Sequence, residues 1–227
     1  SRTLSYAAGD YYLQDAGSLL ALAAAGGDET SASTAGLRVC DLCGSPGGNA
    51  TGLVEAAGQD GLVVANEPIR GRLPPLVFNL TRTGSDRYAI TSLDPERLAD
   101  RLPAAFDLVL VDAPCSGQAL LGRGKQQPSA LSPRQISLNA ARQRRILTAA
   151  VRLLRPGGRL IYSTCTFAEE ENEQQVAWLM QDHGLVPDPV ARLEPYRSDR
   201  SLPAYRIWPH RERSAGAFAA SLRAGPA

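Results

Sequence analysis

The chain has 227 residues, of which 44% are apolar, and a formal net charge of +1. This size and apolar content allow a substantial core and suit a single domain. The sequence contains no run of about 18 apolar residues, and its first residues lack the layout of a signal peptide, which excludes a membrane span and an export signal among the given residues. The near-neutral charge does not by itself indicate a nucleic-acid binder. We therefore expect a soluble, cytoplasmic protein that does not associate with a membrane.

The first half of the sequence predicts strands that alternate with turns and helices. The expected elements are a strand over 37–42, a glycine-rich turn over 44–48, a helix over 50–57, a strand over 61–67 and a weaker strand over 88–91. Glu67 ends the second of these strands, and Asp94 follows the third.

The second half continues the same alternation. Residues 106–112 are almost all apolar, as in a central strand of a parallel sheet. The further expected elements are a helix over 132–154, a strand over 159–164, a helix over 168–183 and a closing antiparallel pair over 205–208 and 217–222. Polar loops are expected near 27–36 and 118–133. Alternating strands and helices predict one α/β domain over 1–227 with right-handed crossovers.

Ligands bind at the carboxyl ends of the strands in open α/β sheets, and four of the predicted ends carry suggestive residues. After the first strand, the glycine-rich turn allows a ligand to approach the backbone amides closely. Glu67 lies 26 residues after Asp41, where an acid can accept both hydroxyls of a ribose. Such turns serve NAD, nucleotides and S-adenosylmethionine alike. An ordinary turn and a solvated acid are the alternative interpretation.

The other two strand ends each carry a cysteine. Cys115 lies in the motif D-A-P-C-S-G and Cys165 in S-T-C-T. A single free cysteine is usually a buried, inert residue. Two at successive strand ends, one with Asp112 three residues before it, favour a catalytic pair. Cys40 and Cys43 form a C-x-x-C motif, but the sequence has no second such motif to complete a zinc site, so no metal site is predicted.

With these motifs the chain resembles the RNA 5-methylcytosine methyltransferases of the Sun/NOL1/NOP2 (RsmB/NOP) family. The resemblance extends from 11–18, through R-P-G-G at 155–158 and E-E-N-E at 170–173, to R-I-W-P-H at 206–210. The pair of cysteine motifs is specific, since DNA cytosine methyltransferases use one motif cysteine and this RNA family uses two. The resemblance implies a class I S-adenosylmethionine-dependent methyltransferase fold, which is Rossmann-like. Its mostly parallel sheet has seven strands, an antiparallel last pair and helices on both faces.

The resemblance also implies the cofactor, the substrate and the site. The cofactor would be S-adenosylmethionine, and the substrate RNA, with rRNA favoured over tRNA. Glu67 would bind the ribose and Asp94 the adenine, while Asp112 would face both the cofactor and the target base. Cys165 would attack carbon 6 of cytosine, and Cys115 would assist product release. The loop around the methionine and ribose would consist of Cys43, Gly44, Ser45, Pro46, Gly47, Gly48 and Asn49.

Covalent catalysis explains why the reaction needs these residue types. Carbon 5 of cytosine is a weak nucleophile, and addition of a thiolate at carbon 6 makes it reactive enough to accept a methyl group. An acid must then stabilise charge at N3, and Asp112 is placed in the sequence to do so. The glutamates that follow Cys165 would raise its pKa unless a helix N-terminus or arginines outweigh them.

The chain also departs from the family pattern. Asn49 stands where the family commonly has lysine, and the segment after Gly117 lacks the family's Arg-Asn-Pro-Asp type of sequence. No separate RNA-binding domain is recognised, so RNA recognition would come from this domain, a partner or a further domain of a longer protein. A monomer is expected. The alternatives are a non-catalytic RNA-binding protein on the same fold, a methyltransferase for another substrate class, and a zinc or NAD protein.

Overall fold

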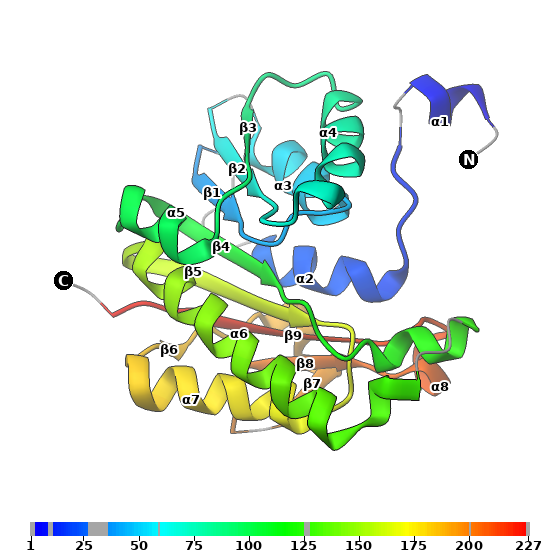
Figure 1. The fold of residues 1–227 in the computed structure, drawn as a ribbon, viewed down its shortest axis with the longest axis vertical. Helices are drawn as coiled ribbons and strands as arrows, with labels where there is room; N and C mark the ends of the chain where they lie inside the picture. The colour runs from blue at the N-terminus through cyan, green and yellow to red at the C-terminus, as the bar shows by residue number, and fades with distance from the viewer. Residues whose placement is uncertain are drawn as a thin grey trace.

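The computed structural model describes residues 3–8, 11–26, 36–58, 60–124, 128–199 and 201–225. These residues form one nine-stranded sheet covered by helices (Figure 1). The strands are β1 (Arg38–Asp41), β2 (Leu62–Asn66), β3 (Tyr88–Thr91), β4 (Phe106–Asp112), β5 (Leu154–Thr164), β6 (Val186–Pro187), β7 (Arg197–Asp199), β8 (Ala204–Ile207) and β9 (Ala217–Arg223).

The sheet has the order β3-β2-β1-β4-β5-β9-β8-β7, and β6 pairs with β9. Strands β1 to β5 run parallel to one another, whereas β9 is antiparallel to both β5 and β8. The α/β prediction and the closing antiparallel pair are confirmed. The path from β3 to β8 contains the seven expected strands. The short strands β6 and β7, which the sequence pattern did not predict, extend it.

Helices cover both faces of the sheet, as expected. In Figure 1, α2, α3 and α4 lie on one side and α5, α6 and α7 on the other, and each side has its own buried apolar cluster. The helices are α1 (Leu4–Ala8), α2 (Ala16–Gly26), α3 (Gly48–Ala57), α4 (Leu73–Thr81), α5 (Pro95–Arg101), α6 (Pro133–Leu153), α7 (Glu173–His183) and α8 (Pro209–Glu212). None of these described helices is long and apolar enough to cross a membrane.

Short 3-10 turns occupy several segments between these elements. They are η1 (Arg70–Arg72), η2 (Gln118–Arg123), η3 (Pro128–Leu131), η4 (Glu169–Glu171) and η5 (Ala191–Tyr196). Two of them lie in the loop expected over 118–133. The loop expected near 27–36 lies almost wholly outside the described residues.

The helix predicted over 168–183 is interrupted at Asn172, between η4 and α7. The Asn172 side chain accepts a hydrogen bond from the Thr164 hydroxyl (2.5 Å) and donates one to the carbonyl of Thr166 (3.0 Å). These bonds tie the start of α7 to the segment that carries Cys165. The predicted continuous helix is therefore wrong at its first turn, because side-chain bonds to the end of β5 compete with helical ones.

Candidate active site

The parallel register brings the predicted site residues to one edge of the sheet. Asp41 ends β1 and pairs with Leu110 of β4, while Asp112 ends β4 and pairs with Ser163 of β5. Glu67 directly follows β2, and Cys165 directly follows β5. The carboxyl ends of β1, β2, β4 and β5 therefore lie side by side, as the sequence predicted.

The loop over 43–49 has a fixed shape. The backbone amide of Gly44 donates to the carbonyl of Asn66 at 2.8 Å, and the Asn79 side chain donates to the carbonyl of Pro46 at 2.8 Å. Gly47 has φ 115°, which favours glycine, and a Cβ there would lie 3.0 Å from Asn79. Helix α3 starts at Gly48, so its first amides point toward the strand edge, where they favour an anionic group.

Two acids at this edge are buried with unused hydrogen-bonding capacity. Asp41 is fully buried and neither of its carboxylate oxygens has a well-formed hydrogen bond. Burial, together with the nearby Asp112 and Glu67, raises the pKa of Asp41 to about 8, and the backbone amide of Cys43 only partly offsets this. Glu67 accepts from the amide of Ile69 at 2.9 Å with one oxygen, while the other has no hydrogen bond. Buried acceptors of this kind are suited to a ligand that brings its own donors.

Arg72 is a site residue that the sequence pattern did not reveal. Its guanidinium donates to the carbonyl of Ser45 at 2.8 Å and forms an ion pair with Oε2 of Glu67 at 3.6 Å. The Ser45 hydroxyl in turn donates to the carbonyl of Arg72 at 2.7 Å. Arg72 therefore links the glycine-rich loop to the acid after β2. Arg72 lies outside every motif described in the sequence.

Asn49 contacts the acid at the end of β4. Its side-chain amide donates to Asp112 at 3.0 Å from the first turn of α3. Burial raises the pKa of Asp112, and hydrogen bonds from the Ser163 and Asn49 side chains oppose that rise. The residue that replaces the family's usual lysine thus supplies a neutral donor to Asp112 in place of a cation.

The two predicted thiols are in contact. Cys115 Sγ and Cys165 Sγ lie 3.3 Å apart, and both side chains are partly buried. The pKa of Cys165 is lowered, chiefly by its hydrogen bond with the Cys115 side chain, although burial and Asp112 act in the opposite direction. The same interaction, together with burial, raises the pKa of Cys115. These opposite shifts favour Cys165 over Cys115 as the thiolate.

Of the three glutamates after Cys165, one is part of the site. Glu169 and Glu170 are exposed, whereas Glu171 is fully buried. Glu171 accepts from the backbone amide of Ser116 and from the Gln143 side chain, both at 2.9 Å. Its charge opposes ionisation of Cys165, as the sequence suggested, but ranks below the other contributions. Glu171 thus anchors the segment that follows Cys115.

Asp94 lies at the N-terminus of α5, three residues after β3. One carboxylate oxygen accepts from the backbone amide of Glu96 at 3.1 Å, and the other pairs with Arg145 at 3.0 Å. Asn66 joins this segment to the rest of the site by bonding the amide and the carbonyl of Leu93, each at 3.0 Å. The expected contact between Asp94 and adenine stays a prediction.

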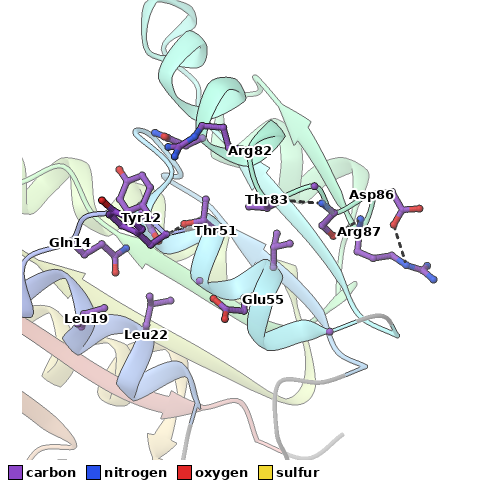
Figure 2. A pocket seen from close by; sticks show the side chains of 18 residues that line it. Tyr12, Gln14, Leu19, Leu22, Thr51, Glu55, Arg82, Thr83, Asp86 and Arg87 are labelled. Atoms are coloured by element: carbon purple, nitrogen blue, oxygen red, sulfur yellow. Dashed lines mark hydrogen bonds and ion pairs between the residues drawn. The ribbon is translucent and has the colours of Figure 1, made fainter. Parts of the chain in front are cut away.

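An open groove of about 1070 Å³ lies between α3, the end of α4 and the segment that leads into α2 (Figure 2). It reaches the candidate active site only at the back of the glycine-rich loop, where Gly48 packs against Gln14 and Tyr12. The charged side chains that line the groove are Glu55, Arg82, Asp86 and Arg87, two of each sign. The groove therefore carries no charge that would identify a ligand.

The strand order, the glycine-rich loop after β1 and the acid after β2 define a class I S-adenosylmethionine-dependent methyltransferase fold. A family model described as 16S rRNA methyltransferase RsmB/F matches residues 21–223. The chain belongs to this family, which confirms the resemblance seen in its motifs.

Curated relatives and solved structures agree with this assignment. Ribosomal RNA small subunit methyltransferase F of Escherichia coli O139:H28 is 36% identical over 83% of the chain and 38% of its own length. The Salmonella heidelberg protein of the same name is 34% identical over 97% of the chain and 46% of its own length. The chain thus spans less than half the length of these relatives. NSun6 from Pyrococcus horikoshii, solved with the S-adenosylmethionine analogue SFG, has a TM-score of 0.82 and 25% identity, covering 98% of the chain and 55% of that structure.

Proposed function

We propose that this chain is the catalytic part of an S-adenosylmethionine-dependent methyltransferase that modifies carbon 5 of a cytosine in small-subunit rRNA. Family membership and the names of the relatives support the rRNA substrate. The contact between Cys115 and Cys165 carries the proposal for the reaction, because it unites the two thiols that a covalent mechanism needs.

The strand edge fits S-adenosylmethionine. The cofactor carries ammonium and ribose hydroxyl donors, and Asp41 and Glu67 present buried carboxylate oxygens without well-formed hydrogen bonds. Its carboxylate suits the amides at the start of α3. We propose that Glu67 binds the ribose, Asp94 the adenine and Asp112 the reacting end, with the loop over 43–49 around the methionine. When bound, the cofactor supplies an electrophilic methyl group on its sulfonium.

In the proposed reaction, the Cys165 thiolate attacks carbon 6 of the target cytosine. The raised pKa of Asp112 favours its protonated form, which can donate to N3 as charge develops there. Asn49 holds one oxygen of Asp112 and so orients its other oxygen toward the base. These two residues thereby stabilise the covalent state while carbon 5 takes the methyl group.

Cys115 has two proposed roles. Before attack, its thiol donates to Cys165 and stabilises the thiolate. Once Cys165 is bonded to the base, the Cys115 thiol gives its proton to solvent, and the resulting thiolate takes the proton that leaves carbon 5 as Cys165 is expelled as a thiolate. The distance of 3.3 Å between the two sulfurs supports both roles.

The test compares variants of the two thiols. Cys165→Ser should abolish methyl transfer and leave no covalent adduct, because a serine hydroxyl is hardly ionised at neutral pH. Cys115→Ala should attack and methylate, then stall with RNA attached, in an adduct that survives denaturing electrophoresis. The double variant should form no adduct. Reversed phenotypes would exchange the two roles. Methyl transfer unaffected by either change would refute covalent catalysis by these thiols.

We further propose that the catalytic part acts as a monomer and that most RNA affinity comes from a further domain or a partner. The relatives are more than twice as long as the segment matched here, which leaves room for such a domain in those proteins. With a net charge of +1, the chain itself should bind RNA weakly and with a steep dependence on salt. Tight binding that is insensitive to salt would contradict this.

A further inference from the structure

The two active-site thiols are held close together by the backbone around them. The amide of Ala113 donates to the carbonyl of Ser163 (2.8 Å), and the amide of Ala119 donates to the carbonyl of Cys165 (3.0 Å). The hydroxyls of Ser116 and Thr166 bond at 2.7 Å. Hydrogen bonds therefore join the segments after β4 and β5 on both sides of the sulfur pair. These bonds keep the two cysteines close together.

The distance between the sulfurs is short enough for bond formation after a small movement. They are 3.3 Å apart, and a disulfide needs about 2.05 Å, so an approach of roughly 1.3 Å closes the gap. Rotation of a cysteine side chain moves its sulfur by more than this. Two thiols in direct contact also resemble the arrangement in which one thiol reacts with an oxidant and the neighbouring thiol resolves the product.

The other two cysteines provide an internal contrast. Cys40 is fully buried in β1, and burial raises its pKa well above the ordinary value. Burial and the neighbouring Asp41 also raise the pKa of Cys43. Both stay protonated at neutral pH and are poor nucleophiles. The C-x-x-C motif, which draws attention in the sequence, is therefore the less reactive pair.

We propose that Cys115 and Cys165 form a reversible disulfide under oxidation, and that this modification switches the active site off. The oxidant class is a peroxide, with hydrogen peroxide as the probe. The Cys165 thiolate attacks one peroxide oxygen, the oxygen–oxygen bond breaks, and hydroxide leaves and takes up a proton. This yields a sulfenic acid on Cys165. The Cys115 sulfur then attacks the Cys165 sulfur and displaces the hydroxyl as water. In sum, two thiols lose two electrons and two protons, and the peroxide becomes two waters.

The disulfide would remove both groups that the reaction needs. A disulfide sulfur on Cys165 cannot add to carbon 6, and Cys115 would lose its proton. A thiol reductant attacks the bond and restores both residues, so the loss is reversible. The consequence for methylation rests on the proposed function, whereas formation of the disulfide does not.

The experiment treats the full, reduced chain with hydrogen peroxide, alkylates the remaining thiols and maps them by mass spectrometry. Two of the four thiols should disappear, in a peptide that links Cys115 to Cys165, and dithiothreitol should regenerate both. Methyl transfer, measured in parallel with labelled cofactor, should be lost and then recovered. Alkylation of Cys165 should be blocked in the oxidised protein, even in a preparation that shows no methyl transfer.

Two variants sharpen the test. Cys40→Ala should still form the Cys115–Cys165 link. Cys115→Ser should lose reversibility, because Cys165 would have no resolving thiol and would proceed to sulfinic acid. Four free thiols after peroxide, or a link between Cys40 and Cys43, would overturn the proposal. A Cys115–Cys165 disulfide that leaves methyl transfer intact would also overturn it, and would count against Cys165 as the nucleophile.

Discussion

The two ends of the parallel strands treat buried acids in opposite ways. At the carboxyl end, Asp41 and Glu67 have oxygens without hydrogen-bond partners. At the amino end, Asp107 forms an ion pair with Arg155 at 2.6 Å and accepts a hydrogen bond from the backbone amide of Arg38 at 2.7 Å. Asp107 is thus fully paired, whereas Asp41 and one oxygen of Glu67 have no well-formed hydrogen bond, although Arg72 lies 3.6 Å from that oxygen of Glu67. The unsatisfied end is where this fold class binds its ligand.

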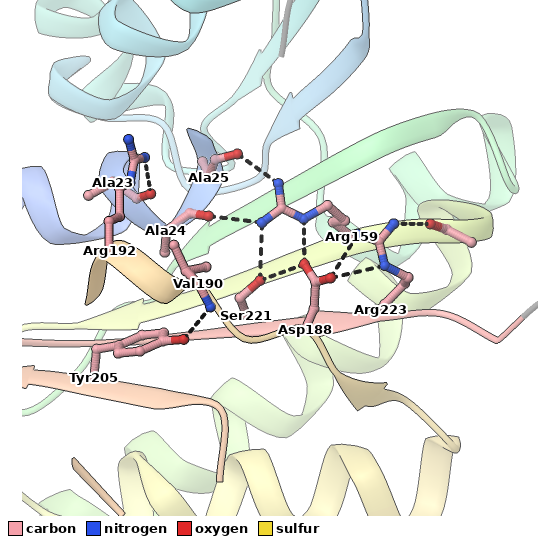
Figure 3. Close-up of polar contacts among 11 residues, drawn as sticks. Ala23, Ala24, Ala25, Arg159, Asp188, Val190, Arg192, Tyr205, Ser221 and Arg223 are labelled. Carbon is pink, nitrogen blue, oxygen red and sulfur yellow. Dashed lines mark hydrogen bonds and ion pairs between the residues drawn. The ribbon is translucent and has the colours of Figure 1, made fainter. Parts of the chain in front are cut away.

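The amino end also contains a larger network around Asp188 (Figure 3). One carboxylate oxygen of Asp188 binds Arg159 at 2.6 Å, and the other binds Arg223 at 2.7 Å. Arg159, which is almost fully buried, also donates to the carbonyls of Ala24 and Ala25 at the end of α2. Burial alone would raise the pKa of Asp188, but the two arginines lower it below its ordinary value. Charge at this end stabilises the fold.

The contrast gives the two ends opposite responses to pH. A carboxyl whose pKa is lowered by folding contributes stability that is lost as acid protonates it, and Asp188 is of this kind. A carboxyl whose pKa is raised by folding destabilises the folded state once it ionises. The contribution of Asp41 to stability therefore falls as the pH rises from about 4, its pKa in the unfolded chain, to about 8, its pKa in the folded protein. At neutral pH, Asp41 at the carboxyl end therefore contributes less to stability than it does at acidic pH.

Breaking the amino-end network should have the largest effect. Asp188→Ala leaves the guanidinium of Arg159 buried without its carboxylate, which typically costs about 3–5 kcal/mol of unfolding free energy. Urea denaturation measures this directly. The exposed pair Arg152–Asp100 serves as the control, since Arg152→Ala should cost less than about 1 kcal/mol. Equal losses in the two variants would remove the distinction between buried and surface pairs.

Removing an acid at the carboxyl end should affect binding more than stability. Glu67→Ala deletes the proposed ribose acceptor, and loss of a charge-assisted bond of about 1.5–3 kcal/mol weakens S-adenosylmethionine binding roughly 10- to 100-fold. Isothermal titration calorimetry gives the affinity. Glu169→Ala, at an exposed glutamate near Cys165, is the matched control and should bind normally. Unchanged affinity in Glu67→Ala would refute the assignment.

Neutralising Asp41 should separate stability from binding. Asp41→Asn removes the buried carboxyl, so the fold should gain about 1–3 kcal/mol at pH 8 and lose the decline in stability between about pH 4 and pH 8. Denaturation curves across this range test the slope. Affinity for S-adenosylmethionine should fall in the same variant. A variant that is destabilised at pH 8 would show that the carboxylate is compensated in the fold.

The sequence predicted the strands better than the helices, for physical reasons. β4 is almost wholly apolar and its bounds match the prediction, whereas α4 begins with Leu73 and two prolines and resembles a turn. Proline is tolerated in a first helical turn, where its missing donor has no partner to lose, so the local pattern misleads. Helix α2 is apolar on several sides and shows no clear amphipathic period, because it packs against the sheet and α3.

Residues of the candidate site were predictable where a motif carries them. Cys115, Cys165 and Glu67 follow strand ends, and the parallel register then forces them together. Arg72 and Gln143 were missed because they reach the site from a 3-10 turn and from the middle of α6, positions without a sequence signature. Whether a carboxylate is paired or free depends on distant arginines, and no local pattern contains that information.

The position of α2 has a consequence for synthesis of the chain. This helix precedes every described strand, yet it packs against β9, the last one, and its final carbonyls are bound by Arg159. The amide of Ala215 also reaches back to Asp15 at 3.3 Å. Until β9 has been synthesised, α2 with its buried residues Leu20 and Ala24 lacks one of the strands that it packs against. Complete docking of α2 therefore waits until β9, at the other end of the described residues, has been synthesised.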